Sequence, residues 1–139
     1  MRSNNMSGET NLATLLQSMQ PKRIPGEFVF VTLAHGVYGD GAQWQPVATF
    51  AEQEGLTLVI PKAAADQDQL SYQSVFSCIT LTIHSSLDAV GLTAAFATKL
   101  AEHGLSANVI AGYYHDHIFV QTEVAEQALA ALAELTLQP

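Results

Sequence analysis

The most prominent polar cluster in the sequence is His115-Asp116-His117. On an extended backbone, side chains at positions i and i+2 point to the same face, and imidazole nitrogens are common zinc ligands. A zinc site needs a third protein ligand, and His84 or Asp88 would have to supply it. The same residues also suit a tight hairpin turn at His115-Asp116 with both histidines at the solvent edge. We expect this turn, with no metal ion and no other cofactor; the alternative is a small metal-dependent enzyme that uses His115 and His117.

A second group of residues has the pattern of an anion site at the start of a helix. A predicted strand ends at Ser85-Ser86, Asp88 is suited to cap the following helix, and Gly91 has no side chain. Unsatisfied backbone N–H groups at this point would face a ligand carboxylate at the positive end of the helix. The alternative is that Asp88 only caps and Gly91 only permits close packing. If Gly91 lies in an ordinary helical turn, Gly91→Ala should stabilise the fold by up to about 1 kcal/mol.

Other residues with chemical potential favour structural roles. The glycine-rich segment HGVYGDG, residues 35–41, lacks the Gly-Lys-Ser/Thr ending of a phosphate loop. It is either a lid over a ligand pocket or a long turn against which Trp44 packs, and we expect the turn. Cys78 is predicted to be a core or sheet-face thiol. Ser85 and Ser86 lie in no nucleophile-elbow motif, so a hydrolase is not indicated.

Hydrophobic periodicity predicts the elements that position these residues. Strands are predicted at 27–35, 56–61, 75–85, 106–114 and 117–123, and helices at 12–19, 46–55, 88–104 and 124–135. The polar segment 63–71 is predicted to connect two halves. The second half has the order βαββα. In the first half, no strand after residue 61 is evident: either that strand is borrowed, or residues 72–74 extend the long strand of the second half. FAEQEGLTLVI (50–60) matches LAEHGLSANVI (100–110) as a helix end, a glycine stop and a strand, which indicates related halves.

The segment LDAVGLTAAFATKLAEHGLSANVIAGYYHDHIFV, residues 87–120, resembles an ACT domain. Its GYYHDHIFV run is similar to that of bacterial stand-alone proteins with two ACT-like units in tandem. The resemblance is strong over residues 75–135 and looser before residue 63, and no proline precedes the loop glycine. It implies an α+β fold of ferredoxin-like βαββαβ units, with an antiparallel sheet and helices packed on one face. It also implies an N-terminal ACT-like half at residues 1–70 and a C-terminal ACT-like domain at residues 71–139.

The resemblance implies a non-enzymatic regulatory protein that senses a small molecule, an amino acid above all. The ligand is expected at the strand-helix loop and at the following strand of an adjacent unit, against Ser86, Leu87, Asp88, Val90, Gly91, Leu92, Asn108, Val109 and Ile110. The amide oxygen of Asn108 suits a ligand amine. A purely structural dimerisation module is a further alternative.

Composition limits the partners and the compartment. The 139 residues are 48% hydrophobic and 13% charged, with a formal net charge of −8, so nucleic acid and anionic membrane surfaces are not expected partners. The low charge fraction predicts an apolar surface that a homodimer or larger assembly covers. No apolar stretch reaches the ~18 residues of a membrane helix. A single cysteine and a polar first segment predict a cytoplasmic protein.

Overall fold

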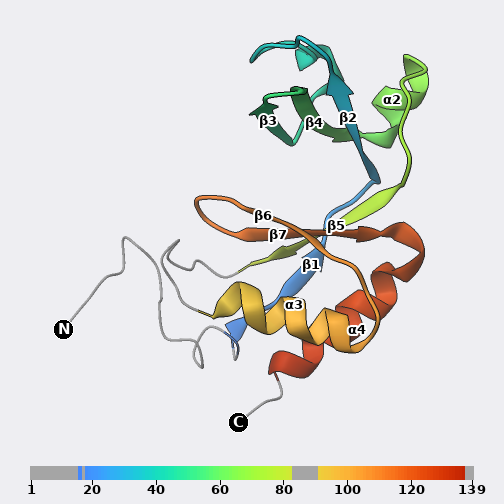
Figure 1. The fold of residues 1–139 in the computed structure, drawn as a ribbon. Helices are drawn as coiled ribbons and strands as arrows, with labels where there is room; N and C mark the ends of the chain where they lie inside the picture. The colour runs from blue at the N-terminus through green and yellow to red at the C-terminus, as the bar shows by residue number, and fades with distance from the viewer. Residues whose placement is uncertain (1–15, 17, 83–90, 137–139) are drawn as a thin grey trace, which may run out of the picture. The chain divides into compact units, whose positions relative to one another are not determined.

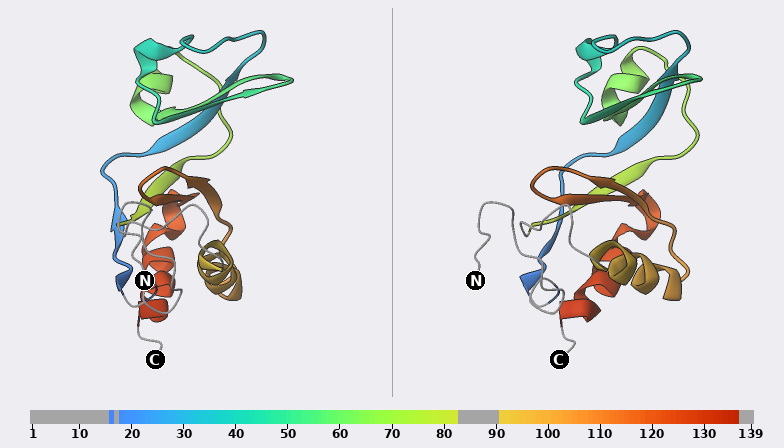
Figure 2. Two further views of the ribbon diagram at one scale, coloured as in Figure 1. Left: turned by 90° about the vertical axis from the view of Figure 1, so that its left-hand side faces the viewer. Right: turned by 60° about the vertical axis from the view of Figure 1, so that its left-hand side comes forward.

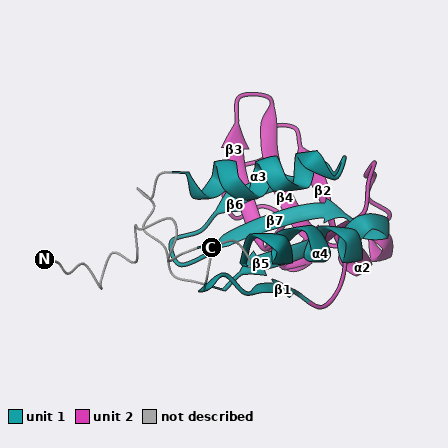
Figure 3. Cartoon of the chain, turned by 90° about the horizontal axis from the view of Figure 1, so that it is seen from below, with its two compact units in different colours: residues 1–24, 78–139 teal, residues 25–77 magenta. Residues whose placement is uncertain are grey.

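The structure is a computed structural model that describes residues 16, 18–82 and 91–136. The chain forms two compact units, shown in Figure 3: unit 1 contains residues 1–24 and 78–139, and unit 2 contains residues 25–77. Unit 2 is thus inserted into the sequence of unit 1. The division into domains 1–70 and 71–139 stays a prediction.

Unit 1 has four strands in the spatial order β1-β5-β7-β6 (Figure 1), with the bounds β1 Pro21–Arg23, β5 Phe76–Leu81, β6 Asn108–Ala111 and β7 Asp116–Gln121. β1 pairs antiparallel with β5, and β6 pairs antiparallel with β7. From β5 onward the chain follows the predicted order βαββα. The remaining strand of the ferredoxin-like fold is β1, which comes from the start of the chain. The predicted α+β fold class is therefore confirmed.

Two helices, α3 (Leu92–Glu102) and α4 (Ala125–Thr136), cover one face of the unit 1 sheet, as Figure 2 shows; the short 3₁₀ helix η3 (Thr122–Val124) precedes α4. Leu92, Phe96 and Leu100 recur every four residues on α3 and are at most 3% exposed. They share one core with Ile79 and Leu81 of β5. Because strand side chains alternate, Thr80 lies on the opposite face of the sheet. The sequence period correctly predicted both helices.

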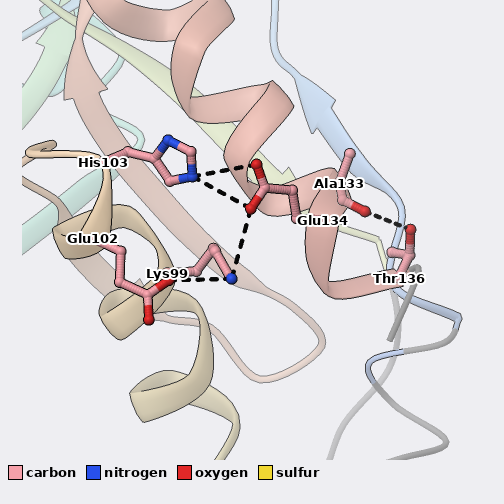
Figure 4. A network of polar contacts seen from close by, with 6 residues as sticks. All are labelled: Lys99, Glu102, His103, Ala133, Glu134 and Thr136. Carbon is pink, nitrogen blue, oxygen red and sulfur yellow. Dashed lines mark hydrogen bonds and ion pairs between the residues drawn. The ribbon is translucent and has the colours of Figure 1, made fainter. Parts of the chain in front are cut away.

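Charged side chains tie the end of α3 to α4 (Figure 4). Lys99 Nζ lies 3.1 Å from Glu102 Oε1 and 3.6 Å from Glu134 Oε1, and His103 Nε2 lies 3.2 Å from Glu134 Oε2. The hydrogen bond with His103, together with the charges of His103 and Lys99, holds the pKa of Glu134 below its ordinary value. Glu134 is thus the shared acceptor between the two helices.

Unit 2 contains β2 and η2 followed by β3, β4 and α2, with the bounds β2 Phe28–Leu33, η2 Ala42–Trp44, β3 Ala48–Glu52, β4 Gly55–Pro61 and α2 Lys62–Gln67. The strand order is β3-β4-β2, all antiparallel, and Phe76 at the start of β5 pairs with Phe28 of β2. The strand that the sequence did not reveal in the first half is therefore the beginning of β5. The core contains Val29, Val31, Trp44, Leu56, Leu58, Ile60 and Ala65. Unit 2 repeats the strand order of unit 1, but its first helix is reduced to the three residues of η2.

The predicted helix at 46–55 is wrong, because residues 48–52 form strand β3. β3 pairs with β4 through a hairpin in which Glu52 lies opposite Gly55, so Gly55 ends no helix. A Cβ on Gly55 would lie 2.8 Å from the carbonyl oxygen of Leu33. The two backbone segments approach too closely for a side chain at this position, which explains the glycine. The two matching sequences therefore have different structures. Residues 50–60 lie in a hairpin, whereas residues 100–110 contain the end of a helix and the start of a strand, so they are not equivalent elements.

Two further predictions are wrong, and a third lies mostly outside the described residues. The predicted connection at 63–71 contains most of helix α2, which buries Ala65. The β6–β7 turn runs from Gly112 to His115, whose carbonyl accepts the Gly112 N–H at 2.9 Å, so Asp116 begins β7 and does not form the turn. Most of the helix predicted at 12–19 lies outside the described residues. Among the helices that the structure describes, none is long and apolar enough to cross a bilayer.

Candidate functional site

The predicted ligand loop is described at its end, where helix α3 begins. Ser86, Leu87, Asp88 and Val90 lie outside the described residues. Gly91 occupies the N-cap position that was predicted for Asp88, with φ +94° and ψ −13°, and its carbonyl accepts the N–H of Ala95 at 2.8 Å. A side chain is disfavoured at this φ, so the backbone itself requires glycine. Gly91 therefore does not lie in an ordinary helical turn, and the condition under which Gly91→Ala would stabilise the fold is not met.

The other predicted ligand residues divide between the two faces of the sheet. Leu92 is buried in the core of unit 1, and Val109 of β6 packs against the same core. Asn108 and Ile110 lie on the opposite face because neighbouring strand residues alternate. Asn108 is exposed, and its Nδ2 donates to the Phe119 carbonyl at 3.4 Å. Of these residues, the structure brings Leu92 and Val109 together in one core. The amide oxygen of Asn108 takes no part in the bond to Phe119.

The His115-Asp116-His117 cluster is split by the end of the hairpin. His115 closes the turn, whereas His117 lies in β7, half-buried, with Nδ1 2.9 Å from Thr80 Oγ1. Burial lowers the pKa of His117, and the neighbouring His115 lowers it further. Burial also raises the pKa of Asp116. His117 is thus a hydrogen-bonding partner of Thr80, and burial favours its neutral form.

No group of three or more potential metal ligands is found within residues 16, 18–82 and 91–136. His84 and Asp88, the third ligands considered for a metal site, lie outside those ranges. Cys78 is buried on β5, and burial raises its thiol pKa, as expected for a sheet-face thiol.

The glycine-rich segment between β2 and β3 surrounds an open depression of about 510 Å³. Its lining residues all belong to unit 2 and are Leu33, Ala34, His35, Gly36, Gly39, Asp40, Gly41, Gln43 and Trp44. Trp44 is 9% exposed, and its Nε1 donates to Asp68 Oδ2 at 2.7 Å, which confirms that the aromatic ring is packed down. The loop is recognisable in the sequence, but the depression was not predicted; the available signal was Asp40, a carboxylate between two glycines.

Successive turns fix the course of this loop. The Val37 N–H donates to Asp40 Oδ2 at 2.9 Å, and the Asp40 N–H donates back to the Val37 carbonyl at 2.9 Å. His35 (φ 65°), which lines the depression, and Gln45 (φ 53°), which follows the last lining residue, adopt left-handed conformations. Such conformations are unfavourable for side-chain-bearing residues and persist only where the surrounding structure imposes them.

Two family models, each described as an ACT domain, match the chain over residues 7–77 and 73–134. The chain belongs to the ACT-domain family. ACT domains are regulatory modules that generally bind small molecules such as amino acids and often oligomerise, so the chain is a regulatory ACT protein with two such domains in tandem.

Solved structures agree with this fold. A Vibrio cholerae protein of unknown function, described as a possible transport protein, is 60% identical with a TM-score of 0.82, covering 90% of this chain and 95% of its own. An Agrobacterium tumefaciens protein is 18% identical with a TM-score of 0.69, covering 85% and 89%. The ligand-free regulatory subunit of aspartate kinase from Thermus thermophilus is 9% identical with a TM-score of 0.61, covering 83% and 95%. The last two show the ACT fold alone. No curated protein matches the sequence.

Proposed function

We propose that this ACT protein is not an enzyme and that it binds an amino acid or a close analogue at the start of α3 in unit 1. The observation that carries the proposal is Gly91, which has a positive φ at the N-cap of an 11-residue helix. The backbone N–H groups that precede Ala95 in the first turn have no acceptor inside the helix. Beside a residue without a side chain, they are open to a ligand carboxylate.

The remaining parts of the proposed site come from the loop and from β6. Ser86, Leu87, Asp88 and Val90 precede Gly91 in sequence, and Leu92 contributes its backbone N–H, because its side chain is buried. On β6, exposed Asn108 offers its amide oxygen to the ligand ammonium group, with Val109 and Ile110 as neighbours. In this proposal, Asn108 meets the ligand of an adjacent unit, as the family resemblance implies.

A matched pair of glycine variants tests this site. Gly91 and Gly104 flank α3, and both have a positive φ, +94° and +73°. Alanine at either position introduces a similar backbone strain of about 1 kcal/mol. A Cβ at Gly104 meets no atom within 4 Å, so Gly104→Ala is the control for strain alone.

The measurement is titration calorimetry of the full chain with each of the twenty amino acids. The amino acid that binds the wild type should bind Gly91→Ala about 10- to 100-fold more weakly, the range of a lost charge-assisted hydrogen bond. Its affinity for Gly104→Ala should match the wild type. Equal affinities for the two variants would remove this loop from the site.

We also propose that the protein acts as a homodimer or a larger homo-oligomer. Val47, Phe50, Tyr113 and Tyr114 are each between 56% and 70% exposed, a large apolar area for a chain with few charges. Phe50 lies on β3, which is an edge strand of the unit 2 sheet. Edge strands have unpaired backbone groups that can bind a second chain. Cys78 is a free buried thiol, which suits the reducing cytoplasm where we propose that the protein works.

A further inference from the structure

We propose that the β6–β7 hairpin of unit 1 is a pH-sensitive element, in which proton uptake by His117 loosens the hairpin from β5. Besides the backbone pairing of β5 with β7, a side-chain hydrogen bond joins the two: His117 Nδ1 lies 2.9 Å from Thr80 Oγ1. Thr80 Oγ1 in turn lies 3.9 Å from the Sγ atom of buried Cys78. Thr80 is only 7% exposed, so water does not readily replace this hydrogen bond.

The other edge of the His117 ring lies beside the turn of the same hairpin. A Cβ on Gly112 would lie 3.2 Å from His117 Nε2 and 3.0 Å from the carbonyl oxygen of His115. The Gly112 N–H donates to that carbonyl at 2.9 Å and closes the turn. His117 thus lies between β5 and the turn, and a change in its charge acts where the hairpin meets β5.

The surroundings of His117 disfavour a positive charge. Among the residues that the structure describes, no carboxylate forms an ion pair with His117. His115 is a second imidazole two residues earlier, and Lys22 of β1 pairs with Thr80, so its side chain lies on the same face of the sheet. Asp116 attracts the charge, but strand alternation places it on the opposite face. Burial and His115 together lower the pKa of His117, and Asp116 opposes them only in part.

Proton uptake therefore favours the loosened hairpin. An imidazole exposed to water has a pKa of about 6.5, whereas the pKa of His117 in the folded unit is lower, so the proton binds more tightly once the ring is exposed. Between pH 7.5 and pH 5.5, the equilibrium constant for loosening should rise about fivefold. His103 is the contrast, because its Nε2 lies 3.2 Å from Glu134 Oε2 and a proton on this ring strengthens the contact.

The hairpin also carries Asn108, to which the proposed function assigns the ligand ammonium group. A loosened hairpin weakens that contact, so the amino acid should bind less tightly in acid. This consequence rests on the proposed function, whereas the loosening itself requires no ligand. An experiment on the ligand-free protein therefore tests the hairpin even if the proposed ligand site is wrong.

Hydrogen–deuterium exchange of the ligand-free full chain at pH 7.5 and pH 5.5 measures the loosening. Each exchange rate is divided by the intrinsic rate at the same pH, and strands β2 and β4 of unit 2 are the internal reference. We expect the protection of amides in residues 108–121 to fall about fivefold at pH 5.5 relative to this reference. Unchanged protection of the hairpin, or an equal fall in the reference strands, would overturn the proposal.

Two variants that each remove one imidazole of unit 1 locate the effect. His117→Gln keeps a side-chain amide that can bond to Thr80 but takes up no proton, while His115 and Asp116 stay in place. His103→Gln removes an imidazole at the end of α3, outside the hairpin. The loss of protection in acid should disappear in His117→Gln and persist in His103→Gln. A loss that persists in His117→Gln would refute the role of His117.

A third variant covers the case in which glutamine at position 117 itself disturbs the hairpin. Thr80→Val keeps the shape of the side chain but lacks the hydroxyl that bonds to His117. Hairpin protection in this variant should already be lower at pH 7.5, by about 3- to 10-fold, the range of one lost hydrogen bond. Protection equal to the wild type would show that the bond to Thr80 does not hold the hairpin and would overturn the proposal.

Discussion

Alanine substitutions at Gly39 and Gly41 probe how tightly the loop of unit 2 is held against its sheet. Both glycines have a positive φ, +101° and +81°, and they lie two residues apart in the same loop. A Cβ at Gly39 meets nothing within 4 Å. A Cβ at Gly41 would lie 2.9 Å from Leu58 Cδ1 and 3.0 and 3.1 Å from two ring carbons of Trp44. The pair thus separates backbone strain from crowding.

The expected magnitudes follow from these two terms. A side chain in the left-handed region costs about 1–2 kcal/mol, and both variants carry this term. Crowding in a packed core costs about a further 1–3 kcal/mol, and only Gly41→Ala carries it, because the Trp44 ring is packed and bonded to Asp68. We expect Gly39→Ala to lower the free energy of unfolding by about 1–2 kcal/mol and Gly41→Ala by about 2–5 kcal/mol.

Urea unfolding followed by Trp44 fluorescence measures both variants through a probe that lies in unit 2 itself. The difference between the two free energies, at least about 1 kcal/mol, is the quantity that tests the packing. Equal destabilisation by the two substitutions would refute the reasoning that Gly41 allows close contact with Leu58 and Trp44.

Three further predictions concern pH and assembly. Because burial lowers the pKa of His117 below 6.5, protonation disfavours the fold: stability should be full above that value and fall as pH drops below it. His117→Gln should flatten urea-unfolding free energies between about pH 5 and pH 8, and an unchanged slope would contradict this. The lowered pKa of Glu134 contributes stability above 4.5 that is lost toward more acidic pH, so Glu134→Gln should weaken the acid dependence of unfolding; the same dependence as the wild type would refute a role for its contacts with His103. Light scattering should give at least twice the chain mass of 14.9 kDa, and a monomer at tens of micromolar protein would contradict the proposed assembly.

Elements that bury a regular apolar stripe could be predicted from the sequence. α3 places Leu92, Phe96 and Leu100 in the core at helical spacing, and β2 is a run of aromatic and β-branched residues. The spacing of Val47, Phe50 and Ala51 suits a helix equally well, yet Phe50 is 70% exposed and its backbone pairs with β4. Short segments such as β3 are decided by the neighbouring strand and not by local period.

The other differences between predicted and observed elements also depend on contacts between residues that are distant in sequence. β1 is only Pro21–Arg23, without an apolar pattern, and it is a strand because β5 pairs with it. Helix α2 is six residues long and depends on packing of Ala65 and on the pair between Lys62 and Asp66, 2.7 Å apart. The helix start near Gly91 is predictable from the sequence, but the positive φ of Gly91 and the depression beside Asp40 arise from backbone geometry that one sequence does not reveal.

Thermal unfolding of the full chain in the presence of each of the twenty amino acids shows whether this regulatory ACT protein binds an amino acid, as we propose. Ligand present at 100 times its Kd stabilises the folded state by about 2.7 kcal/mol, so the Tm should rise by several degrees for at least one amino acid. The rise should grow with the logarithm of ligand concentration. A Tm that no amino acid raises, at concentrations up to the millimolar range, would contradict the claim.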